Sequence, residues 1–207
     1  MMNDGYMSIL EQIASKSPTP GGGTVAALTL AHAHSLAVMV SRLTIGKEKW
    51  QEGHEISNLI INSSIETLEK SISLAGDDSL AFDKVMESYR MPRGNDVEIE
   101  SRKLAILEST IGAAQTPSEI AEEGLKLLSL LPDLARFGNL NAITDLAASS
   151  ELAYTAVYIA TLNVKINVDT MSNEKLDRIQ EDTTIILTKS KELITQIRDI
   201  VSGRMKS

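Results

Sequence analysis

A turn rich in proline and glycine, Ser17-Pro18-Thr19-Pro20-Gly21-Gly22-Gly23-Thr24, stands directly before a long apolar segment. Its prolines and consecutive glycines exclude a helix interior, so a helix is predicted to begin where the turn ends. Such a turn presents free backbone N–H groups and the positive end of a helix, which suit an anion or a polar ring edge. The pattern is neither a Walker A loop nor a dinucleotide fingerprint, because no Gly-Lys-Ser/Thr follows and no strand precedes. A tight connector without a ligand is the equally weighted alternative.

Two aspartates are candidates for acid–base chemistry. Asp83 lies beside an apolar stripe, where partial desolvation would raise the pKa of its carboxyl group, although spacing alone favours an exposed helix residue. Asp145 and Glu151 are the only charged residues between positions 142 and 164. A buried carboxylate is costly without a partner, yet Asp145 also falls in a predicted first helical turn, where the helix dipole stabilises negative charge. Asp145 is therefore equally compatible with a catalytic role and with simple capping.

The histidines and the absence of cysteine limit metal chemistry. His32 and His34 are two residues apart on a predicted helix, so they face nearly opposite directions and cannot share one metal ion. The i, i+4 spacing of helical zinc sites is absent, which favours core or interface histidines. A chain without cysteine has no disulfide, no thiolate metal site and no cysteine nucleophile.

The elements that must position these residues are all predicted to be helices, because apolar residues recur at helical spacing almost throughout. Gly76 is expected to end one helix, with Asp77 and Asp78 as N-caps of the next. Thr116-Pro117-Ser118-Glu119 matches a capping box with proline at the first helical position, and so predicts a new helix there. The Ala-rich helix is expected to be central, since its small side chains let neighbours approach closely. The predicted helices cover residues 7–16, 24–45, 50–74, 79–89, 97–115, 116–137, 142–167 and 172–201. The fold class is therefore an all-α, single-domain helical bundle over residues 1–207.

Composition excludes several classes of partner. The net charge of −8 and the lack of a long basic run argue against a nucleic-acid partner. The most apolar stretches, 24–45 and 142–168, are interrupted by ionisable residues, which argues against membrane spans. The N-terminus lacks a basic region followed by an apolar run, so no signal peptide is expected. A cytoplasmic location is the expectation.

Four blocks of the chain, in order, resemble the cyclodeaminase/cyclohydrolase family. They are residues 15–27 with the S-P-T-P-G-G-G turn, 39–47, 78–92 with F-D-K-V-M, and 138–145 with G-N-L-N. This family includes the C-terminal domain of formiminotransferase-cyclodeaminase and stand-alone bacterial methenyltetrahydrofolate cyclohydrolases. The chain departs from the usual pattern at several positions, which bears on substrate choice: Thr24 for Ser, Leu140 for Pro, Thr144 for Ser, His32 and His34 for small residues, and Leu146-Ala147 for Ala-Gly.

The resemblance implies a self-associating helical protein, expected as a homodimer, that acts on tetrahydrofolate without a metal or redox cofactor. Asp83 and Asp145 would form an acid–base and electrostatic pair, and Lys47 and Arg90 would hold the glutamate tail. The residues expected to orient the pterin or its one-carbon unit are Gly21, Gly22, Gly23, Thr24 and Asn141. Formiminotetrahydrofolate cyclodeaminase is the first expectation and methenyltetrahydrofolate cyclohydrolase the alternative. A non-catalytic folate-binding or scaffold protein is the third reading.

Overall fold

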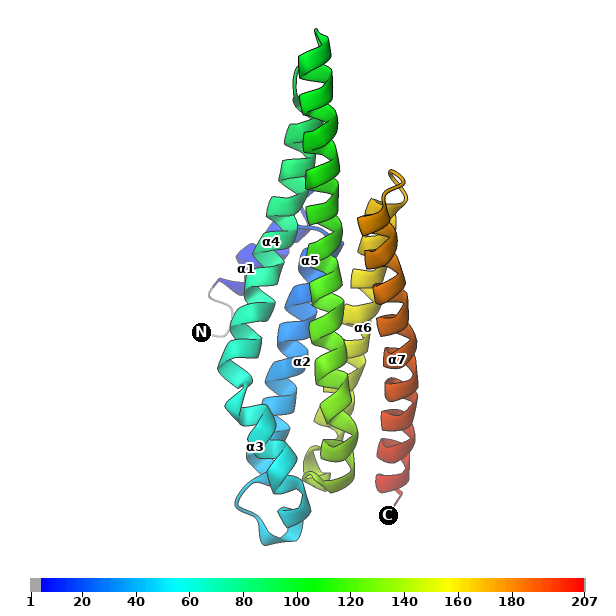
Figure 1. Ribbon diagram of the computed structural model, residues 1–207. Helices are drawn as coiled ribbons and strands as arrows, with labels where there is room; N and C mark the ends of the chain where they lie inside the picture. Colours follow the sequence, from blue (N-terminus) through cyan, green and yellow to red (C-terminus); the bar gives the residue numbers. More distant parts are fainter. Residues whose placement is uncertain (1–4, 207) are drawn as a thin grey trace.

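The computed structural model describes residues 5–206, and within that range it contains helices and no strand (Figure 1). Long helices run up and down beside one another, joined by short turns at both ends of the bundle (Figure 1). The helices are α1 (Tyr6–Ile13), α2 (Gly22–Thr44), η1 (Glu48–Gly53), α3 (His54–Asn62), α4 (Ser64–Arg90), α5 (Asp96–Phe137), η2 (Leu140–Ala142), α6 (Ile143–Val168) and α7 (Glu174–Arg204). The prediction of an all-α bundle is confirmed.

Helix α2 is the central helix, as its alanine content predicted. It packs against α4 on one side and α6 on the other, and its alanines are buried. By length and composition α2 is apolar enough to cross a membrane, but 61% of its most apolar window is buried inside the bundle. The apolar composition is thus explained by core packing, since small side chains allow close helix approach.

Helices α2 and α6 are antiparallel, and their register is set by polar contacts along their length. The Ser149 hydroxyl, in the second turn of α6, donates to the Ala33 carbonyl, midway along α2, at 2.7 Å. At the far end the Asn139 side chain donates to the Leu43 carbonyl at 2.8 Å, and the Asn139 N–H donates to the Thr44 hydroxyl at 3.0 Å. The beginning of α6 therefore lies at the end of α2, and the beginning of α2 lies near the end of α6.

Helix α4 corrects two predictions. The segment expected as one helix, 50–74, is divided into η1, α3 and the start of α4, with a turn at Ser63. Gly76 does not end a helix, and Asp77 and Asp78 lie inside α4 rather than at an N-cap. A glycine within a helix costs only about 1 kcal/mol. Packing of α4 against α2 and α5, with Leu74 fully buried, outweighs that cost.

Helix α5 corrects a third prediction, that a new helix begins at Thr116. Thr116 does not cap a new helix, because α5 runs unbroken through Pro117. The Thr116 hydroxyl instead donates back to the Gly112 carbonyl at 3.4 Å. Proline has no N–H for the carbonyl four residues earlier, which would leave the Ala113 oxygen without its helical partner. The Asn167 amide of α6 donates to that oxygen at 2.9 Å, so the neighbouring helix compensates for the proline.

The α4–α5 hairpin extends beyond the rest of the bundle (Figure 1). Helix α4 continues past the point where α2 begins, and residues 91–95 form the turn at the tip. The hydroxyls of Ser88 and Ser109 lie 3.0 Å apart and join the two helices near that tip. The hairpin thus leaves part of α4 without α2 beside it.

Candidate functional site

The glycine-rich turn brings the start of α2 against the middle of α4. The Thr24 hydroxyl donates to Asp78 Oδ2 at 3.1 Å and lies 3.0 Å from the Ser79 hydroxyl. Gly21, the residue before α2, has no side chain to cap the helix. The first turn of a helix has unpaired N–H groups and a positive field, both of which favour a carboxylate. A carboxylate from α4 therefore lies where the N-terminal end of α2 can use it.

Gly23 is required for this contact. A Cβ atom at position 23 would lie 2.5 Å from Asp78 Cγ and 2.7 Å from Asp78 Oδ2, far inside van der Waals contact. A side chain at position 23 would therefore displace the Asp78 carboxyl group. Gly22 is less constrained, because its added Cβ would meet Asn163 and Ile159 of α6 at 3.6 Å and 3.9 Å, which is ordinary contact.

The Asp78 carboxyl group has altered acid–base properties. Burial raises the pKa of Asp78 above its ordinary value, because desolvation disfavours the charged form. Hydrogen bonds from the side chain and backbone of Thr24 act in the opposite direction and only partly offset this effect. A carboxyl group whose pKa is moved toward neutrality can both give and take a proton more effectively at neutral pH. The turn, Thr24 and Asp78 together can hold a polar ring and transfer a proton.

The predicted site residues divide into two groups at opposite ends of α2. The first group lies near the beginning of α2 and includes the turn residues Gly21, Gly22, Gly23 and Thr24. It also includes two exposed residues of α4: Asp83, five residues after Asp78, and Arg90 at the end of the helix.

The second group lies near the end of α2. Lys47 and Asn141 are exposed there, and Asp145 is partly exposed in the first turn of α6. From Thr24 to Thr44, beside which Asn139 lies, α2 spans roughly 30 Å at 1.5 Å per residue. One chain thus does not bring Asp83 and Asp145 together, nor Lys47 and Arg90.

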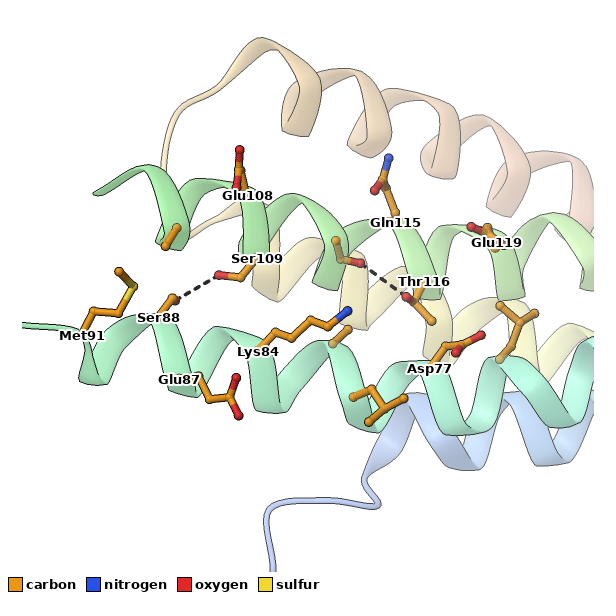
Figure 2. A pocket seen from close by; sticks show the side chains of 15 residues that line it. Asp77, Lys84, Glu87, Ser88, Met91, Glu108, Ser109, Gln115, Thr116 and Glu119 are labelled. Carbon is orange, nitrogen blue, oxygen red and sulfur yellow. Dashed lines mark hydrogen bonds between the residues drawn. The ribbon is translucent and has the colours of Figure 1, made fainter. Parts of the chain in front are cut away.

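A separate pocket lies between α4 and α5, on the side of α4 that Asp77 faces (Figure 2). It has a volume of about 780 Å³. Figure 2 shows Lys84 extending from α4 across the space toward α5, with Asp77 and Glu119 further along. None of the predicted site residues lines this pocket. The adjacent carboxylates therefore lie on different sides of α4: Asp77 lines this pocket, and Asp78 contacts Thr24 of α2.

The two predicted histidines lie apart, as expected. His34 is buried, and burial lowers its pKa to about 4, whereas His32 is exposed and its Nε2 lies 3.4 Å from the Tyr6 hydroxyl. Within residues 5–206 no group of three or more His, Asp or Glu side chains is placed to hold a metal ion.

Sequence reasoning missed the role of Asp78. Its position before an expected helix suggested a local N-cap, whereas the structure shows a contact with Thr24 across 54 residues of sequence. The sequence did show a glycine turn with no capping side chain at the start of a helix, which indicates that an acidic residue from elsewhere could bind there. Spacing along the chain cannot reveal which acidic residue that is.

Comparison with known proteins gives consistent results. The formiminotransferase-cyclodeaminase family profile matches residues 6–183. A methenyltetrahydrofolate cyclohydrolase of Methylorubrum extorquens is 34% identical over 166 residues, which is 80% of this chain and 79% of that protein. The formimidoyltransferase-cyclodeaminase of Gallus gallus is 28% identical over 89% of this chain, which spans only 34% of that longer protein. The crystal structure of formiminotetrahydrofolate cyclodeaminase from Thermotoga maritima superimposes with a TM-score of 0.83 at 26% identity, over 94% of this chain and 93% of that one.

Proposed function

The chain belongs to the formiminotransferase-cyclodeaminase family, and we propose that it is a formiminotetrahydrofolate cyclodeaminase that uses Asp78 for proton transfer. The observation that carries the proposal is the partly buried Asp78 carboxyl group, with its raised pKa, at the start of α2. The close superposition on a cyclodeaminase structure supports the same reaction.

The reaction needs one well-placed proton carrier. In 5-formiminotetrahydrofolate the formimino group on N5 is protonated at its terminal nitrogen. N10 attacks the carbon of this group, so a C–N10 bond forms while the C=N π bond breaks and its electron pair moves to the terminal nitrogen, which becomes an amino group. N10 then loses its proton, the amino group on the same carbon gains one, and ammonia leaves as the C–NH₂ bond breaks, giving the 5,10-methenyl cation. Because both nitrogens are bonded to one carbon, a single carboxyl group can accept the first proton and deliver it to the second.

The Gly21–Thr24 turn would position the pterin. Free N–H groups at the start of α2 can bind the carbonyl edge of the ring. The reacting nitrogens would then lie beside Asp78, which α2 and α4 hold in place through Thr24. The chemistry proposed here requires neither a metal ion nor a redox cofactor.

The alternative is methenyltetrahydrofolate cyclohydrolase, favoured by the 34% identity to such an enzyme over most of both chains. Water would attack the methenyl carbon, and the same carboxyl group would take the proton from water and deliver one to the departing ring nitrogen. A negative carboxylate would also stabilise the cationic substrate.

A spectrophotometric assay distinguishes the two reactions. Methenyltetrahydrofolate absorbs strongly in the near ultraviolet, so its appearance from the formimino substrate together with ammonia release would support the cyclodeaminase. Accelerated decay of added methenyltetrahydrofolate, without turnover of the formimino substrate, would replace it with the cyclohydrolase. Folate binding without either reaction would leave only the non-catalytic reading.

Asp83 and Asp145 remain proposed contributors, and Asp145 could act only from a second copy of the chain. Exposed apolar side chains on α2 and α6, including Leu43 and Tyr158, support a homodimer. If two copies paired with these faces antiparallel, the Asp145 end of one would approach the glycine-rich turn of the other.

A mixing experiment tests the shared site. An inactive Asp78→Asn variant mixed with an inactive Asp145→Asn variant should regain part of the wild-type activity after subunit exchange. A monomeric mass in solution would remove Asp145 from the mechanism. Wild-type turnover by both Asp83→Asn and Asp145→Asn would remove both residues.

A further inference from the structure

The Asp78 carboxyl group is one end of a short chain of hydrogen bonds. Thr24 Oγ1 lies 3.1 Å from Asp78 Oδ2 and 3.0 Å from Ser79 Oγ, so this hydroxyl stands between two neighbouring side chains of α4. Thr24 is buried, whereas Asp78 and Ser79 are both partly exposed. The middle of the chain is therefore shielded, and a ligand can reach its two ends.

These two hydroxyls differ from many others on the helices. The hydroxyls of Thr44, Ser71 and Thr161, for example, each donate to a carbonyl one turn earlier in their own helix. Within residues 5–206, Thr24 and Ser79 make no such bond, and their hydrogen bonds join α2 to α4 instead. Both hydroxyl protons are therefore available to a chain that includes Asp78.

The direction of the hydrogen bonds depends on whether Asp78 carries a proton. Each hydroxyl has one proton to donate, and an ionised carboxylate can only accept. When Asp78 is ionised, Ser79 donates to Thr24 and Thr24 donates to Asp78, so Ser79 Oγ offers a ligand only its lone pairs. When Asp78 is protonated at Oδ2, Asp78 donates to Thr24, Thr24 donates to Ser79, and the Ser79 hydroxyl can donate its proton to a ligand.

We propose that Ser79 is the group that touches the reacting nitrogens and that it passes their proton to and from Asp78 through Thr24; this inference rests on the proposed function. After the C–N10 bond forms, N10 gives its proton to Ser79 Oγ. Ser79 gives its own proton to Thr24, and Thr24 gives its own to Asp78 Oδ2. N10 keeps the electron pair of its N–H bond, and Asp78 becomes neutral.

The second half of the transfer reverses these movements. Asp78 returns a proton to Thr24, Thr24 gives one to Ser79, and Ser79 gives one to the amino nitrogen, whose lone pair forms the new N–H bond. The bond from carbon to that nitrogen then breaks, and ammonia leaves with the bonding pair. The N10 lone pair forms the C=N bond of the methenyl cation, and Asp78 ends ionised, as it began.

Two observations favour this route over direct contact between Asp78 and the substrate. The two nitrogens are bonded to one carbon and lie about 2.3 Å apart, as judged from ordinary C–N bond lengths, so one hydroxyl can serve both. Burial raises the pKa of Asp78, which makes this carboxylate a better proton acceptor than an exposed one, and Thr24 is the side chain that contacts it.

Single-turnover formation of the methenyl product tests the relay with three variants. Ser79→Ala and Thr24→Val each remove one hydroxyl and should slow this step by about 100-fold, with little change in KM. Thr24→Ser keeps the hydroxyl and should stay within about threefold of wild type. Ser73→Ala is the matched control, because Ser73 donates to the Asp77 carboxylate at 3.1 Å elsewhere on α4, and it should not change the rate.

Two further measurements separate proton transfer from a merely structural role. The double variant Thr24→Val/Ser79→Ala should be no slower than the slower single variant, since one gap already breaks the chain, whereas independent contributions would multiply. In mixtures of H₂O and D₂O, the rate should fall along a curve for wild type and Thr24→Ser, because several protons move together. The same plot should be straight for Ser79→Ala.

The outcomes distinguish the relay from the proposed reaction. A wild-type rate in Ser79→Ala, losses that multiply in the double variant, or a straight isotope plot in wild type would each overturn the relay. If Ser79→Ala and Thr24→Val keep wild-type rates while Asp78→Asn does not, Asp78 acts directly on the substrate and the proposed reaction stands without the relay. If wild type forms no methenyltetrahydrofolate from the formimino substrate, the proposed reaction fails and the relay fails with it.

Discussion

Replacing Gly23 with alanine should separate the start of α2 from the Asp78 carboxyl group. The added Cβ would lie 2.5 Å from Asp78 Cγ, so atoms that need about 3.5 Å must move apart by about 1 Å. Neither helix can shift that far alone, because α2 and α4 are both packed in the bundle. The Asp78 side chain would rotate away instead, and its hydrogen bond with Thr24 would be lost.

The size of the effect follows from opposing terms. Loss of a hydrogen bond to a charged group costs about 1.5–3 kcal/mol, and local overpacking costs about 1–3 kcal/mol. Alanine in place of helical glycine returns up to about 1 kcal/mol. We therefore expect a net destabilisation of about 1.5–5 kcal/mol, which corresponds to a Tm lower by at least about 3 °C for a chain of this length.

Thermal unfolding followed by circular dichroism measures this change, and Gly76→Ala provides the matched control. Gly76 is also a glycine inside α4, but its added Cβ would meet no atom within 4 Å. Gly76→Ala should therefore raise Tm by a few degrees. A Gly23→Ala variant that is as stable as wild type, or stabilised to the same extent as Gly76→Ala, would refute the close approach at Asp78.

Three further predictions follow from particular contacts. Burial raises the pKa of Asp78, so the contribution of this carboxyl group to stability is present at low pH and is lost as the pH rises through that pKa. In thermal unfolding, Asp78→Asn should therefore be at least as stable as wild type at pH 7 and should lose this advantage near pH 3. Burial lowers the pKa of His34 from 6.5 to about 4, so its contribution to stability is fully present above pH 6.5 and is lost as the pH falls to 4, at a cost of up to about 3 kcal/mol in the free energy of unfolding. The variant His34→Leu should not show this loss. If the pH dependence of stability were the same in His34→Leu and wild type, the prediction would be contradicted. Asn167→Ala should lower the free energy of unfolding, measured in urea, by about 1–2 kcal/mol, because the Ala113 carbonyl then lacks a partner. In a Pro117→Ala background the same change should cost clearly less, since the N–H of Ala at position 117 can bond to that carbonyl. Equal costs in the two backgrounds would show that Asn167 and Pro117 are independent.

The sequence predicted the features that local chemistry determines. The proline- and glycine-rich turn preceded a helix, residues around Gly138 ended one, and His32 and His34 faced apart, all as periodicity and turn composition require. Predictions failed where a local signal competed with packing between helices. Gly76 looked like a helix end, yet α4 runs through it.

Other features of the fold and the site depend on contacts between distant segments. Thr116-Pro117 looked like a helix start, yet Asn167 of α6 supplies the hydrogen bond that keeps α5 continuous. Asp78 meets Thr24 only because α2 and α4 are antiparallel in a particular register. Likewise, the wide separation of Asp83 from Asp145 becomes evident only when the helices are placed in space.

The central claim is that Asp78 transfers the proton when the one-carbon bridge of tetrahydrofolate closes. The most direct measurement is kcat/KM for 5-formiminotetrahydrofolate with Asp78→Asn, which keeps the acceptor oxygen for Thr24 but cannot exchange a proton. The expected result is a loss of at least about 100-fold in kcat/KM, with Tm at or above that of wild type at pH 7. A variant that retains kcat/KM within about twofold of wild type would contradict the role of Asp78, since general acid–base catalysis contributes more than that.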